Sequence, residues 1–115
     1  MKEIIFYRTE NNQCPVEDFL DSLSDKQVEK IIWVLRLIQE LERIPKQYFK
    51  KLTGTDEIWE IRIQSGNNNF RLLGFIYKSK FIILTNAFSK KSQKTPKNEI
   101  LLAENRKQEY LRRNK

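Results

Sequence analysis

The sequence contains no histidine, one cysteine (Cys14) and only three glycines among its 115 residues. With one thiol and no imidazole, the chain cannot assemble a zinc site from Cys and His ligands, and we expect no metal or cofactor. An intrachain disulfide and a histidine-based catalytic triad or dyad are excluded in the same way. A general acid or base must therefore be Lys, Arg, Tyr, Asp, Glu or a group on a partner.

Long apolar runs are also lacking. The longest, residues 31–38, is interrupted by Arg36 and is far shorter than the roughly 18 residues that a membrane span requires. The first ten residues, MKEIIFYRTE, carry charges on both sides of a short apolar run, which is unlike a signal peptide. We therefore expect a soluble protein of the reducing cytoplasm that does not bind membranes, folded as one domain over residues 1–115.

Acidic side chains are scarce in the last third of the chain. Residues 1–77 carry 11 Lys and Arg against 12 Asp and Glu, whereas residues 78–115 carry 11 against 3. The excess is densest in KKSQKTPK, residues 90–97. Such a one-sided basic block is typical of proteins that bind nucleic acid or another polyanion. The alternative is a solvated tail that only keeps the protein in solution.

The residues that are present predict an α+β fold. Apolar periodicity and turn residues indicate a strand at 4–7, helices at 15–23 and 25–43, a basic loop at 45–55, strands at 57–64, 69–77 and 81–88, and a helix at 95–112. Ser24 and Gln27 have the spacing of a capping box, and Thr95 before Pro96 has the pattern of an N-cap. The order β-α-α-β-β-β-α favours a small, mostly antiparallel twisted sheet packed on an N-terminal helical hairpin, with a C-terminal helix.

The three consecutive strands predict two different faces of the sheet. If their first turn centres on Gly66-Asn67, one face is continuously apolar and consists of Trp59, Ile61, Ile63, Phe70, Leu72 and Gly74. We expect the helical hairpin to cover this face, and we expect Trp33 and Trp59 in the core.

The opposite face places Arg62 directly across from Arg71, with Asn86 beside Arg71 to within one residue. Two arginines on adjacent strands repel each other unless an anion or a carboxylate lies between them. The pair is therefore either a phosphate site, since guanidinium groups bind phosphate bidentately, or a surface network neutralised by Glu60 and Glu57.

Lysines from two other segments are expected at the same end of the sheet. They follow the last strand or precede the first strand of the meander, and they are Lys50, Lys51, Lys90, Lys91 and Lys94. Their convergence favours a site for a phosphate backbone. Phe88 lies beside these charges, where it either stacks on a base or packs under the last helix.

Four motifs resemble one known family. They are WEIR at 59–62, Phe70-Arg71, KKSQKTP at 90–96 and KKLTG at 50–54. In their order along the chain, with KKLTG first, they resemble the RelE/ParE toxin superfamily, and more narrowly the HigB-like, phage-derived branch of type II toxin–antitoxin systems. The resemblance covers nearly the whole chain.

This resemblance implies a RelE-like fold and a toxin that cleaves mRNA on the ribosome, neutralised by a helix-turn-helix, HigA-like antitoxin. It implies that the neighbouring ribose 2′-OH attacks the phosphate, which Arg62 and Arg71 would hold. Lys90 and Lys94 are the remaining catalytic candidates. The candidate RNA contacts are Lys50, Lys51, Phe88, Lys91 and Lys97.

The chain departs from the family at one position. Many HigB-like sequences have a histidine near the end of the last strand, where this chain reads TNAF at 85–88. A lysine-based or weakened nuclease is therefore expected. Two alternatives remain: a ParE-like toxin that inhibits gyrase without cutting RNA, and a phage remnant that only binds its antitoxin.

Overall fold

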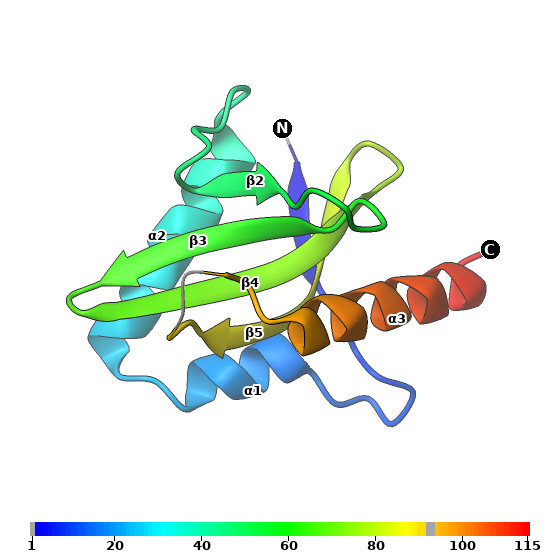
Figure 1. Cartoon of the computed structure of the whole chain (residues 1–115), viewed down its shortest axis with the longest axis horizontal. Coiled ribbons are helices and arrows are strands. Elements are labelled where there is room, and N and C mark those ends of the chain that lie inside the picture. The colour runs from blue at the N-terminus through cyan, green and yellow to red at the C-terminus, as the bar shows by residue number, and fades with distance from the viewer. Residues whose placement is uncertain (1, 92–93) are drawn as a thin grey trace.

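The computed structural model describes residues 2–91 and 94–115. Along the chain the elements are β1 (Glu3–Phe6), α1 (Pro15–Asp21), α2 (Asp25–Glu40), β2 (Phe49–Lys51), β3 (Trp59–Ser65), β4 (Asn68–Tyr77), β5 (Phe81–Ser89) and α3 (Lys97–Arg113). The strands form one sheet in the order β1-β5-β4-β3-β2, in which β1 runs parallel to β5 and the other pairs are antiparallel. Helices α1 and α2 lie on one face and α3 lies on the other (Figure 1). The predicted α+β class and order are confirmed, with one short strand added.

Helices α1 and α2 begin where the local chemistry predicts, and their ends differ from the prediction. The Ser24 hydroxyl accepts a hydrogen bond from the Gln27 backbone N–H, and the Gln27 side chain accepts one from the Ser24 N–H, which confirms the capping box. Helix α2 ends at Glu40 rather than near residue 43, because Leu41 already has an extended backbone. Pro45 therefore does not end this helix. No helix in the described ranges is long and apolar enough to cross a bilayer.

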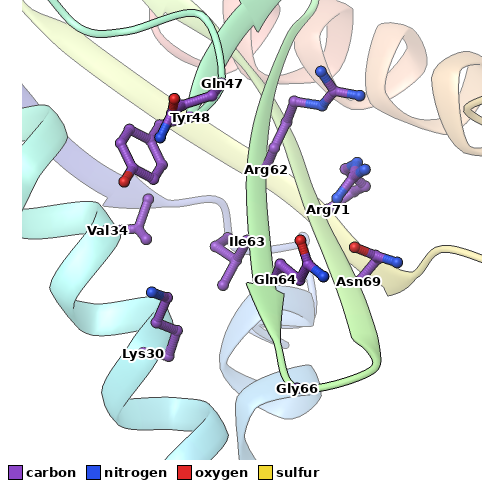
Figure 2. Close-up of a pocket in the computed structure, with 10 residues that line it drawn as sticks. All are labelled: Lys30, Val34, Gln47, Tyr48, Arg62, Ile63, Gln64, Gly66, Asn69 and Arg71. Atoms are coloured by element: carbon purple, nitrogen blue, oxygen red, sulfur yellow. The ribbon is translucent and has the colours of Figure 1, made fainter.

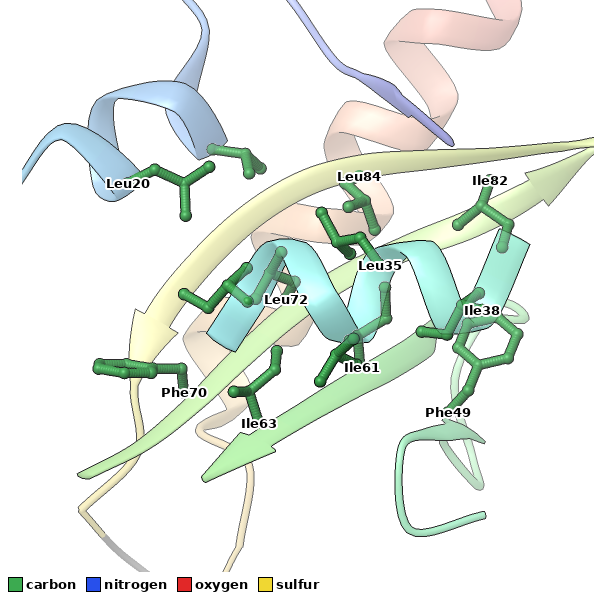
Figure 3. Close-up of a cluster of buried hydrophobic side chains, with 13 residues drawn as sticks. Leu20, Leu35, Ile38, Phe49, Ile61, Ile63, Phe70, Leu72, Ile82 and Leu84 are labelled. Atoms are coloured by element: carbon green, nitrogen blue, oxygen red, sulfur yellow. The ribbon is translucent and has the colours of Figure 1, made fainter. Parts of the chain in front are cut away.

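The apolar face of the sheet is covered by the helical hairpin, as predicted. Residues of α2 pack on side chains of β3, β4 and β5 in one cluster (Figure 3), which includes Ile31, Leu35, Ile38, Ile61, Ile63, Phe70, Leu72, Ile82 and Leu84. Trp59 packs against this cluster and stacks on Phe49, with 4.6 Å between ring centroids.

The expectation of a buried Trp33 is wrong, because this side chain is 49% exposed. Trp33 lies two residues after the buried Ile31, which turns it about 200° around the helix and away from the core. The helical periodicity of α2 therefore contained the signal for its exposure.

The register between β3 and β4 is the predicted one. The turn joins Ser65 to Asn68, and Arg62 lies directly across from Arg71. Between β4 and β5 the prediction is wrong, because Arg71 pairs with Phe88 and Asn86 pairs with Leu73.

The cause is a bulge next to Gly74, which adds one residue to β5 and shifts every later pair. The two backbones approach so closely there that a Cβ on Gly74 would clash with the Ile83 carbonyl oxygen. Glycine is therefore required at this position.

Strand β2 lies inside the segment that was expected to be a loop. Phe49, which is buried, pairs with Ile61, and Lys50 pairs with Glu60. Three residues are too few for an alternating pattern to be detected. The strand nevertheless decides which face of the sheet Lys50 and Lys51 occupy, because consecutive side chains point to opposite faces of a sheet.

Candidate functional site

A buried carboxylate lies on the sheet face on which α3 packs. Glu60 is only 2% exposed, and its Oε1 lies 3.4 Å from Arg62 Nε and 3.7 Å from Arg71 Nε. Its other oxygen accepts a hydrogen bond from the Thr95 hydroxyl, so Thr95 does not cap the helix as predicted. This bond ties the segment before α3 to β3. A buried ionised carboxylate needs such partners, because desolvation otherwise costs several kcal/mol.

Arg71 is the most enclosed cation of the site. It is 8% exposed, its Nη1 donates to the Phe70 carbonyl at 2.9 Å, and its buried Nε has no hydrogen-bond partner among the described residues. Burial lowers the pKa of Arg71, Glu60 opposes that change, and the neighbouring Arg62 lowers the pKa further. A guanidinium with an unsatisfied, desolvated N–H strongly favours an added anionic acceptor.

Lys90 joins the two arginines from the end of β5. Its backbone N–H donates to the Asn69 carbonyl at 2.7 Å. Burial is the main cause that lowers the pKa of the Lys90 ammonium, and the charges of Arg71, Arg62 and Lys50 lower it further, against the effect of Glu60. Lys50 reaches the same face because it pairs with Glu60 in the sheet.

We call Lys50, Arg62, Arg71 and Lys90 the cation cluster. Four cations surround one carboxylate, so the cluster keeps a positive excess of three charges. The alternative prediction, a network neutralised by Glu60 and Glu57, is therefore only half right. Glu60 does lie between the arginines, but Glu57 pairs with Lys51, with 3.3 Å between Lys51 Nζ and Glu57 Oε1. A cluster with this excess binds phosphate groups well.

The other predicted residues are not part of the cation cluster, but Phe88 pairs with Arg71 in the sheet and so lies beside these charges, as predicted. Lys51 pairs with Trp59 in the sheet and so lies on the face opposite Lys50. Lys91, Lys94 and Lys97 are exposed. Phe88 packs with Ile58, Leu73 and Ala103, as the core-packing alternative predicts, and its role in stacking stays a prediction. Ser92 and Gln93 of the KKSQKTP motif lie outside the described residues.

A groove of about 670 Å³ opens beside the arginines (Figure 2). It is lined by Lys30 and Val34 of α2, by Gln47 and Tyr48 before β2, and by Arg62, Ile63, Gln64, Gly66, Asn69 and Arg71 of the β3–β4 hairpin. Sequence reasoning did not find the contribution of α2 and the 45–48 segment, because their approach to β3 depends on packing. Within the described ranges, no group of Cys, Asp and Glu is arranged to hold a metal ion.

Comparison with known proteins gives one result. Residues 18–108 match a family model described as phage derived protein Gp49-like (DUF891). A search of curated proteins finds no match. The family match spans both helices of the hairpin in part or whole, all strands from β2 to β5 and most of α3. It confirms the phage-derived part of the resemblance identified from the motifs.

Proposed function

The chain belongs to the phage-derived Gp49-like family, and we propose that it is the toxin of a type II toxin–antitoxin system, an endoribonuclease that cleaves mRNA on the ribosome. In this proposal the whole chain forms one toxin domain, and a helix-turn-helix antitoxin neutralises it. Support for the family comes from the motif order and the family match. Support for the activity comes from one observation, the cation cluster with its single carboxylate.

The proposed reaction needs no group beyond RNA and the protein. The ribose 2′-oxygen forms a bond to phosphorus, the bond from phosphorus to the 5′-oxygen breaks, and the products end in a 2′,3′-cyclic phosphate and a 5′-hydroxyl. Arg62 and Arg71 stabilise the extra negative charge of the pentavalent transition state. The 2′-OH proton passes to a base, and the conjugate acid of that base, or a water molecule in exchange with it, gives a proton to the leaving 5′-oxygen.

Lys90 is the best candidate for the proton acceptor. A lysine can act as a base only in its neutral form, and the burial and neighbouring cations that lower the Lys90 pKa favour that form. Lys94 stays a second catalytic candidate, and Lys50 holds the RNA backbone. The remaining candidates, Lys51, Phe88, Lys91 and Lys97, are proposed RNA contacts outside the cluster.

The test is inducible expression in a susceptible bacterium, with growth and transcript integrity followed together. We expect growth arrest and cuts in translated mRNAs, mapped by primer extension. Arg62→Ala removes a half-exposed donor to the transition state, and loss of one such donor costs about 100-fold to 1,000-fold in rate. Arg36→Ala, an exposed arginine of α2, is the matched control and should remain toxic.

Three results would contradict the proposal. Arrest with intact transcripts, together with inhibited DNA supercoiling by the purified protein, would indicate a gyrase inhibitor. Stable binding to the antitoxin without toxicity would indicate an inactive remnant. Equal toxicity of the Arg62→Ala and Arg36→Ala proteins would remove the cation cluster from the mechanism.

A further inference from the structure

The groove continues from the cation cluster across an open edge of the sheet. Strand β2 pairs only with residues 59–61 of β3, so the outer edge of β3 from Arg62 onward has no strand partner among the described residues. The Arg62 N–H, which points to this edge, donates to the Tyr48 carbonyl at 2.8 Å. Because backbone groups alternate along a strand, the N–H and C=O of Gln64 point to the same edge.

An aromatic platform lies at the far rim of the groove. The exposed Trp33 ring has the Lys30 Nζ 4.9 Å from its centroid and meets the Tyr48 ring edge-on at 6.1 Å. Lys30 and Tyr48 both line the groove, so Trp33 is adjacent to it. Figure 2 shows Lys30 and Tyr48 on one side of β3 and the two arginines on the other.

The chemistry of the lining fits one class of ligand. The ten residues include three cations (Lys30, Arg62 and Arg71), three amides (Gln47, Gln64 and Asn69) and no carboxylate. Cations bind phosphates, amides bond to the edges of unpaired bases, and exposed rings stack on base faces. A volume of about 670 Å³ lies within the usual range of ligand pockets, roughly 300–1,000 Å³.

We propose that this groove is a second RNA subsite, which rests on the function proposed above. Single-stranded RNA whose phosphate lies on Arg62 and Arg71 crosses the open edge of β3. A neighbouring base stacks on the Trp33 ring, with the Tyr48 ring at the edge of that base, and Lys30 binds the phosphate beside it. An acidic peptide strand that pairs with the same edge is the competing occupant. RNA is favoured because the groove joins the platform directly to the cation cluster.

The experiment uses purified protein and short fluorescein-labelled oligoribonucleotides. Full 2′-O-methylation prevents cleavage, so binding is measured alone by fluorescence anisotropy. In a Trp59→Phe protein, which keeps a ring against Phe49, Trp33 is the only tryptophan and its emission reports stacking. We expect quenching that saturates with the anisotropy change, and tighter binding of a hexanucleotide than of a dinucleotide.

Substitutions separate stacking from charge. Trp33→Ala should weaken hexanucleotide binding by about fivefold to 150-fold, the range for one base stacked on an aromatic ring, without changing the salt dependence. Trp33→Phe should recover most of the loss. Lys30→Gln should lower the slope of log affinity against log salt concentration by about one. Leu41→Ala, another exposed apolar residue of the α2 end, is the control and should bind like wild type.

Three outcomes would overturn the subsite. They are no quenching of Trp33 emission by the oligonucleotide, equal RNA affinity of the wild-type and Trp33→Ala proteins, and a Trp33→Ala protein that loses antitoxin binding while its RNA affinity is unchanged. The function proposed above is tested by transcript cleavage in cells. It survives if Arg62→Ala still abolishes that cleavage while Trp33→Ala does not affect oligonucleotide binding.

Discussion

The two ends of the α3-facing side of the sheet use the same residue types in opposite ways. At one end, which we call the paired end (Tyr7, Arg106, Glu109 and Arg113), the Tyr7 hydroxyl donates to Glu109 at 2.5 Å. The Arg113 Nε lies 2.5 Å from the same carboxylate, and Arg106 donates to the Thr85 carbonyl at 2.8 Å. At the other end, the cation cluster places four cations around Glu60, and Arg71 Nε lies 3.7 Å from Glu60 Oε1 without a hydrogen-bond partner among the described residues.

Coverage by α3 separates these two ends. The C-terminal turns of α3 lie over the paired end, where Tyr110 packs on Phe75 with 5.6 Å between ring centroids. The β3–β4 hairpin extends past the beginning of the helix, so the cation cluster borders the groove (Figure 1). Charges that are covered and matched stabilise the fold, whereas unmatched charges beside an open groove cost stability and remain available to a ligand.

The largest expected effect comes from removing the carboxylate of the cation cluster. Glu60→Gln leaves the arginines and lysines to repel one another, and breaking a buried ion pair costs about 3 kcal/mol of unfolding free energy. Inorganic phosphate should recover part of this loss, because it supplies the missing negative charge. Denaturant unfolding with and without phosphate measures both effects.

The matched control is Glu57→Gln. Glu57 is exposed and pairs with the exposed Lys51, so this substitution should change stability very little. Equal stability of the Glu60→Gln and wild-type proteins in phosphate-free buffer would show that the carboxylate does not hold the cluster together.

A smaller loss is expected at the paired end. Glu109→Gln weakens hydrogen bonds from Tyr7 and Arg113, worth about 2 kcal/mol for bonds to a charged group, and phosphate should recover nothing. The Tyr7 hydrogen bond and Arg113 lower the pKa of Glu109 below its ordinary 4.5. Its contribution is therefore complete above pH 4.5 and is lost as the pH falls through the folded-state pKa.

Unfolding of both proteins over a series of acidic pH values checks this sign. The stability difference between wild type and Glu109→Gln should shrink as the pH falls. A difference that grows on acidification, or a phosphate effect equal to that of Glu60→Gln, would erase the contrast between the two ends.

The smallest effect should have the opposite sign. Lys90→Met removes one cation from an excess, so we expect stability to rise by about 0.5 kcal/mol while RNA affinity falls. The lowered Lys90 pKa means that folding releases a proton between that pKa and 10.5, so wild-type stability rises with pH across this window.

The Lys90→Met protein should lack this part of the pH dependence. Lys26→Met, an exposed lysine of α2, should retain it and serves as the control. A Lys90→Met protein less stable than wild type at neutral pH would mean that the cluster is not overcharged.

Several features of the fold and the site could be predicted because they depend on neighbours along the chain. The capping box of Ser24 and Gln27, the turn after Ser65 and the pairing of Arg62 with Arg71 all follow from short-range spacing. The partner of Arg71 on β5 could not be predicted, because a bulge beside Gly74 shifts the β4–β5 pairing by one residue. The glycine is the only local signal of this bulge. The prediction that Thr95 caps α3 failed for a similar reason, because its hydroxyl donates a hydrogen bond to the Glu60 carboxylate, 35 residues away in the sequence.

The sequence by itself determined which side chains share a face, since period two in strands and 3.6 residues per turn in helices are properties of the local backbone. It thereby placed Arg62 and Arg71 together and, through the position of Ile31, turned Trp33 outward. Only the tertiary structure decided which of the charges are matched and which border an open groove. That outcome depends on where α2, α3 and the segment before β2 exclude water, and these elements meet the sheet only after the chain has folded.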